Sequence, residues 1–563
     1  MARSSPRSRA AGYYTIATLL TERARTMRRR PAIISDEGSL SYGELEESSR
    51  RLAAVFAAQG IGPGTTVLLM LDNHPDSLLC WLALARLGAI EVPVNTAYLG
   101  DVLKHVVRDS AATMLIADAS YAARFSEEIL AGARLETLIL RGEPPAALPP
   151  RLARLRQLGF ADLVAAGRRP AKPPAIAEIT DPRQIMAVMY TSGTTGASKG
   201  VRCTFAHALE YSRCVVEVLD LKPGDRYYNM LPLFHIAGQW AAVFACLIAG
   251  ATVVLKPRFS VSAFWEDIRA QKCNVTLLLG AMANLLHRTP VTAKDRKHPL
   301  DKVLVVPLFP QVKEFAQRFG IRVTTNYGST EVGVPLRAGF RAGKPRLFDL
   351  VDTRSCGRIV SDRFEVKIVD PNDEEVPPGV PGELVVRPKV PWIVMAGYLN
   401  QPEKTMEAWR NLWLHSGDLM MRDKRGNFYF LDRIKDAIRR RGENISSIEV
   451  ENGILKFPAI LECAVYPVPS ALTEQEVMAA VVAKPDNPLE LQALHRFLEQ
   501  TLPKFMVPRF YRLEAALPKT PTGKIQKFQL RAEGLDAPHW DREATSAGPS
   551  KQQQRNETIP GRS

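Results

Sequence analysis

The chain has 563 residues, 46% of them hydrophobic, and a formal net charge of +15. That length exceeds what one ordinary hydrophobic core supports, so at least two domains are expected, and the composition is that of a globular protein. The charge is compatible with nucleic acid, with small polyanionic ligands or with an arginine-rich bias. Because the basic residues are spread along the chain and no nucleic-acid-binding motif accompanies them, we favour the bias, with small anionic ligands contributing, and expect no nucleic-acid partner.

The patterns that mark secreted and membrane proteins are not found. Residues 1–12 are rich in Arg, Ser and Ala and no hydrophobic stretch follows them, which argues against a secretory signal. The longest apolar run, Ala241–Leu255, is too short and mixed to span a bilayer and is expected to be buried core. Seven scattered cysteines without a Cys-x-x-Cys pair indicate neither a disulfide framework nor a zinc site. We therefore expect a cytoplasmic protein without a membrane span.

Most of the chain alternates short β-branched runs with helical patterns. A buried strand is predicted at Thr66–Leu71, followed by a helix at Asp76–Leu87 and a strand at Gly88–Val94. Further strands are predicted at Thr113–Ala117 and Val275–Leu279. This alternation predicts an α/β fold whose sheets are covered by helices.

Changes in composition and in secondary-structure pattern along the chain also indicate domain boundaries. Between Arg141 and Pro182 the chain is rich in Pro, Ala and Arg, which favours a loosely structured connection. Shorter strands and tight turns are expected from Ser361 onward, and a small α/β unit after about Leu431. The predicted organisation is a flexible N-terminus, a large domain, a small domain and a disordered polar tail, at residues 1–12, 13–432, 433–535 and 536–563.

A loop rich in Gly, Ser and Thr follows the predicted strand Ile185–Tyr190. Its glycines, Gly193, Gly196 and Gly200, let the backbone turn sharply and approach a ligand closely. Its hydroxyls and one lysine suit a polyphosphate, at a spacing that differs from the Walker A pattern. A flexible linker would need no such lysine. The loop residues predicted to bind the ligand are Thr191, Ser192, Gly193, Thr194, Thr195 and Lys199.

This segment resembles the phosphate loop of the adenylate-forming superfamily, which includes acyl-CoA synthetases, peptide-synthetase adenylation domains and luciferases. Four further segments match that family in order, so the resemblance covers the chain from about Tyr13 to Arg531. It implies a large N-terminal AMP-binding domain of stacked sheets and helices and a small, mobile α+β C-terminal domain. It also implies ATP and Mg²⁺ as cofactors, with coenzyme A as co-substrate.

The second matching segment is Asn326–Glu331. The resemblance implies that Tyr327 stacks on adenine, that Thr330 contacts the α-phosphate and that Glu331 holds magnesium. A planar ring suits a base, and a carboxylate beside a triphosphate is hard to explain without a cation. By itself this hexapeptide is also compatible with a simple turn.

The third and fourth segments are Trp413–Asp418 and Asp432–Asp436. By resemblance, Asp418 accepts hydrogen bonds from the ribose hydroxyls and Arg433 binds ribose or phosphate. Lys435 then lies at the hinge about which the C-terminal domain rotates. Taken alone, a Gly-Asp pair is usually a simple turn, and the pentapeptide Asp432–Asp436 would favour a solvated charged turn.

The fifth segment, Pro521–Ile525, contains Lys524. This residue matches the lysine that reaches the carboxylate and the α-phosphate during adenylation. A point charge suits that role, because two anions must approach each other. A further motif, Leu231–His235, resembles the family's aromatic and histidine segment and places His235 near the carboxylate. A structural core histidine is the competing interpretation.

The segment Arg441–Glu451, together with Leu278–Met282 and Gly397–Glu403, is similar to the acyl-CoA synthetase branch. The crotonobetaine/carnitine–CoA ligase-like and fatty acid–CoA ligase-like groups are the most similar. The sequence departs from the family pattern at two places. Val305–Leu308 replaces a Gly-Gly-Ala-Pro stretch, which would narrow the acyl pocket or alter its adenine side. Arg441 replaces a glycine beside the expected thiol channel.

These residues predict an AMP-forming acid–thiol ligase. It would activate a small-molecule carboxylic acid as acyl-AMP, release pyrophosphate and transfer the acyl group to coenzyme A. One alternative is a biosynthetic enzyme that uses a carrier-protein thiol or a nitrogen nucleophile, including diazo-forming chemistry. Another is an inert basic scaffold. The sequence does not settle the acid or the oligomeric state, for which a homodimer is an option.

Overall fold

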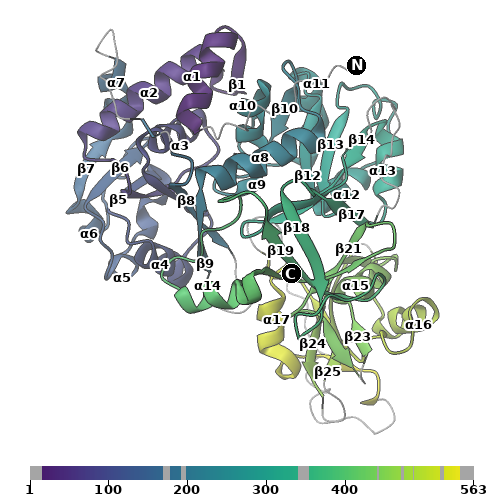
Figure 1. The fold of residues 1–563 in the computed structure, drawn as a ribbon. Helices are drawn as coiled ribbons and strands as arrows, with labels where there is room; N and C mark the ends of the chain where they lie inside the picture. Colours follow the sequence, from purple (N-terminus) through teal and green to yellow (C-terminus); the bar gives the residue numbers. More distant parts are fainter. Residues whose placement is uncertain are drawn as a thin grey trace, which may run out of the picture. The chain divides into compact units, whose positions relative to one another are not determined.

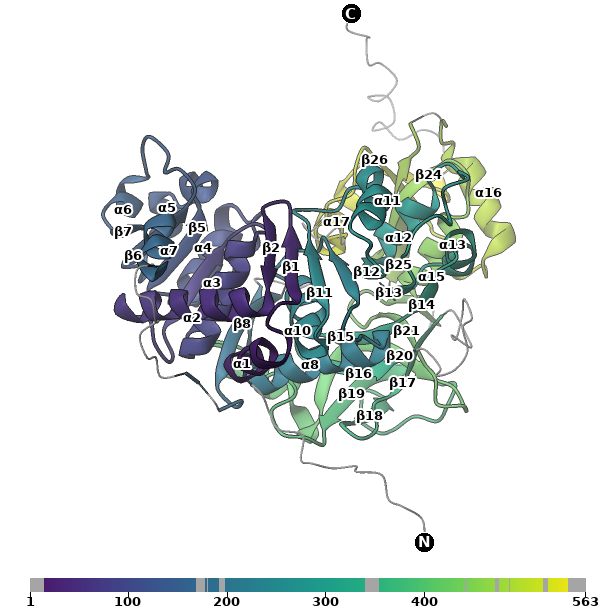
Figure 2. The ribbon, with the colours of Figure 1, turned by 90° about the horizontal axis from the view of Figure 1, so that it is seen from above.

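The fold is described from a computed structural model of the chain (Figures 1 and 2). The description covers residues 15–168, 178–179, 181–191, 198–339, 354–440, 443–470, 475–485, 487–519 and 525–544. Two compact units are found: the first contains residues up to Ser416 and Met421–Tyr429, and the second contains Gly417–Met420 and residues from Phe430 on. Among the described helices, none is both long and apolar enough to cross a membrane.

The first sheet of the large unit has seven strands in the order β7-β6-β5-β3-β4-β8-β9, parallel except for the β8–β9 hairpin. Helices cover both faces: α2, α3 and α7 bury their apolar residues on one, and α4, α5 and α6 on the other. Covering both faces is what a parallel sheet requires. The strands are β3 (Thr66–Met70), β4 (Ile90–Pro93), β5 (Met114–Asp118), β6 (Thr137–Arg141), β7 (Arg156–Gly159), β8 (Ile185–Thr191) and β9 (Lys199–Thr204).

The helices of this layer begin with capping residues that the sequence supplies. Ser41 and Glu44 form a capping box at the start of α2, and His74 caps α3 ahead of Pro75. Helix α3 is buried on nearly all sides, as expected for a helix inside the core. The helices are α1 (Ile16–Met27), α2 (Tyr42–Ala58), α3 (Pro75–Leu87), α4 (Gly100–Asp109), α5 (Glu127–Leu130), α6 (Pro150–Ala153) and α7 (Phe160–Arg168).

The second sheet also has seven strands, in the order β14-β13-β12-β10-β11-β1-β2, with the antiparallel pair β1–β2 at one edge (Figure 2). Its strands are β1 (Pro31–Ser35), β2 (Gly38–Ser41), β10 (Arg226–Asn229), β11 (Thr252–Leu255), β12 (Val275–Leu279), β13 (Lys302–Val306) and β14 (Arg322–Thr324). The associated helices are α8 (Phe205–Leu219), α9 (Ile236–Gly238), the π-helix η2 (Gln239–Phe244), α10 (Ala245–Ala249), α11 (Val261–Ala270), α12 (Gly280–His287) and α13 (Val312–Phe319). Residues 241–255, predicted to be buried core, form η2, α10 and β11.

A third seven-stranded sheet has the order β15-β16-β17-β21-β20-β19-β18. The pairs β15–β16, β16–β17, β17–β21 and β18–β19 are antiparallel, in keeping with the shorter strands and tight turns predicted for this part of the chain. Its elements are β15 (Asn326–Ser329), β16 (Gly333–Arg337), β17 (Ser355–Ile359), β18 (Phe364–Val369), β19 (Gly382–Pro388), helix α14 (Pro402–Ala408), β20 (Leu414–Arg422) and β21 (Phe428–Arg433).

The small unit is an α+β assembly around the four-stranded sheet β24-β25-β26-β27. The β22–β23 hairpin and α15 and α16 bury their apolar side chains with it in one core. The elements are β22 (Ile438–Arg440), β23 (Glu443–Ile445), α15 (Ser447–Ile454), β24 (Ile460–Pro469), β25 (Gln475–Ala483), α16 (Leu491–Thr501), β26 (Phe510–Glu514), α17 (Lys527–Glu533) and β27 (Trp540–Asp541). The structure thus confirms the predicted fold class, a large α/β unit with a small α+β unit.

Two stretches contain more regular structure than the composition suggested. Within the predicted loose connection, β7 pairs with β6, and α7 buries Phe160 and Leu163 in the core. At the other end, β27 lies inside the predicted disordered tail: Trp540 pairs with Tyr511, and Asp541 forms an ion pair with Arg509 at 2.9 Å. In both places a few anchoring side chains order a segment that is otherwise polar or rich in Pro and Ala.

A buried ion pair in the small unit provides a test of its packing. Arg440 Nε lies 2.7 Å from Glu476 Oε2, both side chains are 2% exposed, and Arg440 Nη1 also donates to the carbonyl of Phe505 at 3.0 Å. Glu476→Ala leaves a buried guanidinium without its counter-charge, so we expect a loss of about 3–5 kcal/mol in the unfolding free energy of this unit. Chemical denaturation measures the loss. A loss below about 1 kcal/mol would show that the pair does not stabilise the unit.

Candidate functional site

The predicted phosphate loop connects β8 and β9, which form an antiparallel hairpin with Thr191 opposite Lys199. The loop therefore leaves and re-enters the sheet at one point, and its two ends are fixed by the strand register. Ser192, Gly193, Thr194 and Thr195 lie outside the described residues. Their predicted contacts with a nucleotide stay predictions.

The base of this hairpin is held by residues distant in sequence. Tyr190 donates its hydroxyl to Asp109 Oδ2 at 2.7 Å, at the end of α4. The ring Nε2 of His105, also on α4, lies 2.8 Å from the carbonyl oxygen of Ser198. Lys199 Nζ lies 4.2 Å from the centre of the Tyr398 ring, a cation–π contact. These contacts hold the lysine-bearing strand in place.

Gly200 has a different role from the one predicted. It lies inside β9, where a Cβ atom would come 2.8 Å from Val188 Cγ1 and 3.2 Å from the Tyr190 ring. The backbone amide of Leu399 donates to the Gly200 carbonyl at 2.7 Å. Close packing beside Leu399 requires glycine here, rather than a sharp turn.

The segment Asn326–Glu331 forms β15 and the turn into β16. Gly328 packs against the backbone of Gly333, where a Cβ would come 2.3 Å from the carbonyl oxygen, and Gly333 itself has φ of +69°. Both positions therefore need glycine. The hydroxyl of Ser329 donates to Glu331 Oε2 at 3.1 Å, and so helps to orient that carboxylate.

A hydrogen bond joins this turn to the phosphate-loop hairpin. Thr191 donates its hydroxyl to Glu331 Oε1 at 3.4 Å, across 140 residues of sequence. Thr330 and Tyr327 are buried, at 7% and 8% exposure. Two predicted phosphate-site segments thus meet, and one of them contributes a carboxylate.

His235 lies at the surface as the capping residue of α9. Its Nδ1 accepts the backbone N–H of Ala237 at 3.1 Å. Gly238 lies so close beneath that a Cβ would come 2.2 Å from the carbonyl oxygen of Pro232. His235 is therefore not a core histidine. A histidine that does lie in the core is His207, which is fully buried, and burial lowers its pKa to about 3.

In the small unit, Asp418 and Arg433 are neighbours. Arg433 Nε lies 2.8 Å from Asp418 Oδ1, and Asp418 is 2% exposed. Arg531 donates to the backbone carbonyl of Lys435 at 2.5 Å. Lys524 lies outside the described residues. The structure therefore brings Thr191 and Glu331 together in one unit and Asp418 and Arg433 together in the other.

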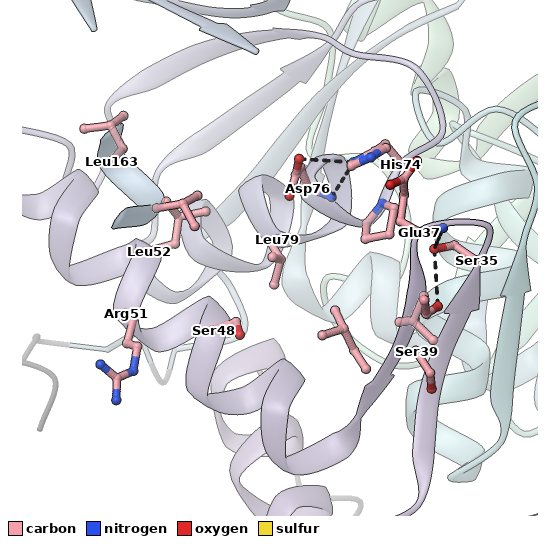
Figure 3. A pocket seen from close by; sticks show the side chains of 15 residues that line it. Ser35, Glu37, Ser39, Ser48, Arg51, Leu52, His74, Asp76, Leu79 and Leu163 are labelled. Atoms are coloured by element: carbon pink, nitrogen blue, oxygen red, sulfur yellow. Dashed lines mark hydrogen bonds and ion pairs between the residues drawn. The ribbon is translucent and has the colours of Figure 1, made fainter. Parts of the chain in front are cut away.

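A cavity of about 300 Å³ lies elsewhere in the large unit. Leu40, Leu52 and Leu79 form part of its apolar wall, and His74 and Asp76 stand at the start of α3 beside it (Figure 3). Among the predicted site residues that the structure describes, none lines this cavity. The candidate site is therefore located by its motifs and their contacts, and this cavity is separate from it.

The comparisons with known proteins agree with the motifs. The sequence profile of the AMP-binding enzyme family matches residues 20–399, and that of the AMP-binding enzyme C-terminal domain matches residues 449–524. The chain belongs to this family. The crotonobetaine/carnitine–CoA ligase of Citrobacter koseri is 33% identical over 513 residues, which cover 88% of this chain and 94% of that protein. The enzyme is therefore an AMP-forming acid–thiol ligase of the acyl-CoA synthetase branch.

Solved structures show the same fold. The o-succinylbenzoate CoA synthetase of Bacillus subtilis, in complex with its acyl-adenylate intermediate, superposes with a TM-score of 0.76 at 26% identity, covering 91% of this chain and 97% of that one. An anthranilate CoA ligase in complex with anthranoyl-AMP has a TM-score of 0.80 at 23% identity, covering 92% and 97%, and at this identity shows the fold alone.

Several supporting residues could not be recognised in the sequence. Asp109 and His105 lie in a segment without any motif, and Tyr398 lies in a segment that indicated only the branch of the family. Only the fold brings these three residues to the hairpin. The one available signal was a Tyr inside the segment Gly397–Glu403, and a tyrosine there is too common to indicate a contact with Lys199.

Lys199 offers the first test of this site. Lys199→Ala removes a cation from the edge of the phosphate loop but takes no side chain from the core, so we expect a KM for ATP raised about tenfold or more and a nearly unchanged melting temperature. Steady-state kinetics and thermal unfolding measure the two. An unchanged KM for ATP with a lowered melting temperature would instead assign Lys199 to the packing on Tyr398.

Proposed function

We propose that this enzyme activates a carboxylic acid with ATP and Mg²⁺ as an acyl-AMP, releases pyrophosphate, and transfers the acyl group to coenzyme A. The observation that carries the proposal is the hydrogen bond between Thr191 and Glu331. It places a carboxylate at the base of a loop suited to polyphosphate, which is where a phosphate-bound cation is needed.

The donor set fits magnesium bound through its substrate. Glu331 contributes two hard oxygen atoms, of which one faces Thr191 and the other Ser329. Within the described parts of the chain, no group of three or more His, Cys, Asp or Glu side chains could hold a metal by itself. A single carboxylate with phosphate oxygens and water is the usual magnesium site of ATP-using enzymes. Bound there, the ion would neutralise charge on the phosphates.

The other residues then have separate tasks. Lys199 and the loop hydroxyls bind the phosphates, Tyr327 stacks on adenine and Thr330 contacts the α-phosphate. Asp418 and Arg433, already paired in the small unit, bind the ribose end. His235 lies beside the carboxylate of the substrate. Each of these assignments follows from the motif that contains the residue together with the chemistry of its side chain.

The more specific parts of this proposal are which acid is activated and which molecule accepts the acyl group. The name of the Citrobacter koseri relative indicates a short, charged acid, and the o-succinylbenzoate CoA synthetase of Bacillus subtilis is named for an aromatic acid, so both classes belong in a substrate panel. Coenzyme A is the preferred acceptor. A carrier-protein thiol or a nitrogen nucleophile, as in diazo formation, is the alternative.

The test is pyrophosphate release across a panel of acids that includes crotonobetaine, carnitine, benzoates and short fatty acids, with and without coenzyme A. We expect acid-dependent release, and an acyl-CoA product only when coenzyme A is present. Release with every acid but no thioester would favour a different acceptor. No release with any acid would contradict the proposed function and favour a scaffold.

Glu331 tests the proposed metal contact. Glu331→Gln keeps the size of the side chain but removes its charge and one of its two acceptor oxygens, so acid-dependent pyrophosphate exchange should fall at least about hundredfold. The unfolding free energy should change by less than about 1 kcal/mol, since the side chain is not a core residue. Magnesium titration is the accompanying control. If excess magnesium affects neither the wild type nor the variant, the metal assignment is wrong.

Lys524 and Lys435 test whether one reaction centre serves two steps. Adenylation needs a positive charge between carboxylate and α-phosphate, whereas thioester formation needs room for a thiol. Lys524→Ala should raise the adenylation barrier by about 3 kcal/mol or more and leave the reaction of supplied acyl-AMP with coenzyme A largely intact. Lys435→Pro should do the reverse, because proline restricts its own φ and the preceding residue. Timing each half-reaction separately decides the matter, and equal slowing of both by Lys524→Ala would contradict domain alternation.

A further inference from the structure

Glu91 is a buried carboxyl group to which the proposed reaction gives no task. It lies in β4, is 1% exposed, and its Cα pairs with Val67 of β3 and Ala187 of β8. Val92 packs on the face that α4 and α5 cover. Because side chains alternate along a strand, Glu91 points to the opposite face, where α3 lies and where Trp81 of α3 contacts Phe244 of the π-helix η2.

A short hydrogen-bonded chain links Glu91 to η2. Gln239 Nε2 donates to Glu91 Oε2 at 3.2 Å, and Trp240 Nε1 donates to Gln239 Oε1 at 2.9 Å. The indole thereby fixes which end of the Gln239 amide faces Glu91. The carboxyl group receives one side-chain donor in an otherwise apolar layer, and its Oε1 has no hydrogen-bond partner among the described residues.

The same glutamine supports the turn that contains His235. The backbone amide of Gln239 donates to the carbonyl of His235 at 3.0 Å, one helical turn earlier. From the other side, the amide Nδ2 of Asn229 donates to the carbonyl of Gly238 at 3.3 Å. Gly238 packs tightly against Pro232, since a Cβ atom there would come 2.2 Å from the carbonyl oxygen of Pro232. A displacement of Gln239 would therefore be passed on to His235. π-Helical turns are themselves found frequently at functional sites.

The groups that face Glu91 leave its charge uncompensated. Burial raises the pKa of Glu91 to about 8, and the hydrogen bond from Gln239 lowers it by less. The neighbouring strands present Val67 and Ala187, and η2 presents an amide and an indole. Cys203 of β9 is the titratable group that interacts electrostatically with Glu91, and burial keeps its own pKa well above the ordinary value. At neutral pH both groups are therefore uncharged.

We propose that Glu91 is a positioning residue, which as a neutral carboxylic acid holds Gln239 and thereby the turn that contains His235 during acid activation. This inference rests on the proposed function, since it needs His235 beside the substrate carboxylate. Ionisation of Glu91 would place a negative charge in an apolar layer, where the carboxylate accepts a hydrogen bond from one side chain, Gln239. Such a carboxylate draws in water or further N–H donors, so Gln239 and the turn before it would shift. Acid activation should then decline as the pH rises through about 8.

The experiment follows acid-dependent ATP–pyrophosphate exchange without coenzyme A, whose thiol titrates in the same range. It uses the wild-type enzyme and Glu91→Gln between about pH 6 and about pH 10, with the best acid from the substrate panel as the probe. For the wild type we expect kcat/KM for the acid to fall up to about tenfold per pH unit above about pH 8. Glu91→Gln, which is isosteric and always neutral, should retain its neutral-pH value at least about one unit further. The KM for ATP should be the same in both.

Two further variants make the outcome decisive. Cys203→Ala should keep the wild-type decline, which separates the thiol from the carboxyl group. Gln239→Leu leaves Glu91 neutral but removes the hydrogen bond, so kcat/KM for the acid should fall about tenfold at neutral pH with an unchanged KM for ATP. It also serves as the test if Glu91→Gln does not fold.

Three results would overturn the inference. They are an identical alkaline decline in Glu91→Gln and the wild type, a decline that disappears in Cys203→Ala, and normal acid kinetics in Gln239→Leu. Absence of exchange with every acid in the wild type at every pH is a different result. It would overturn the proposed function itself, and this inference with it.

Discussion

The structure of the candidate site depends on holding the phosphate-loop hairpin against the turn that contains Glu331. The direct link is the hydrogen bond between Thr191 and Glu331. The base of the hairpin is held by the hydrogen bond from Tyr190 to Asp109 and by the packing of Gly200 beside Leu399. Without these supports a polyphosphate and a carboxylate would have no reason to remain close, since they repel each other until a cation lies between them.

Glycine residues allow the backbone segments around the candidate site to pack closely against one another. Gly200, Gly238 and Gly333 are required for different reasons: side-chain packing, contact with the carbonyl of Pro232, and a positive φ. Each lies within a few residues of a side chain with a proposed role. The rigid sheets thus place the backbone, and the glycines remove the bulk that would keep the functional turns apart.

Much of the fold could be predicted from the periodicity of the sequence, whereas the candidate site could be predicted only in part. The helix predicted at Asp76–Leu87 is observed as α3, one residue longer at its start, and the strand predicted at Val275–Leu279 is observed with the same ends. These elements are dictated by runs of buried apolar side chains. In contrast, the hydrogen bond between Tyr190 and Asp109 joins residues 81 positions apart. The sequence places Glu91 in a strand, but only the order of strands in the sheet shows which face of the sheet its side chain occupies. Such features arise from tertiary contacts, which local patterns do not encode. The motif residues were identifiable because their spacing is specific, whereas their supports were not.

The central claim is that the carboxylate of the substrate attacks the α-phosphorus of ATP. The most direct measurement follows ¹⁸O from a labelled carboxylic acid into the nucleotide product during turnover with coenzyme A. Formation of acyl-AMP makes a new bond between a carboxylate oxygen and phosphorus, and attack of the thiol on the acyl carbon then leaves that oxygen on AMP. The account predicts one ¹⁸O atom in each AMP formed, detected by mass spectrometry. AMP without the label, or label in inorganic phosphate released with ADP, would contradict it.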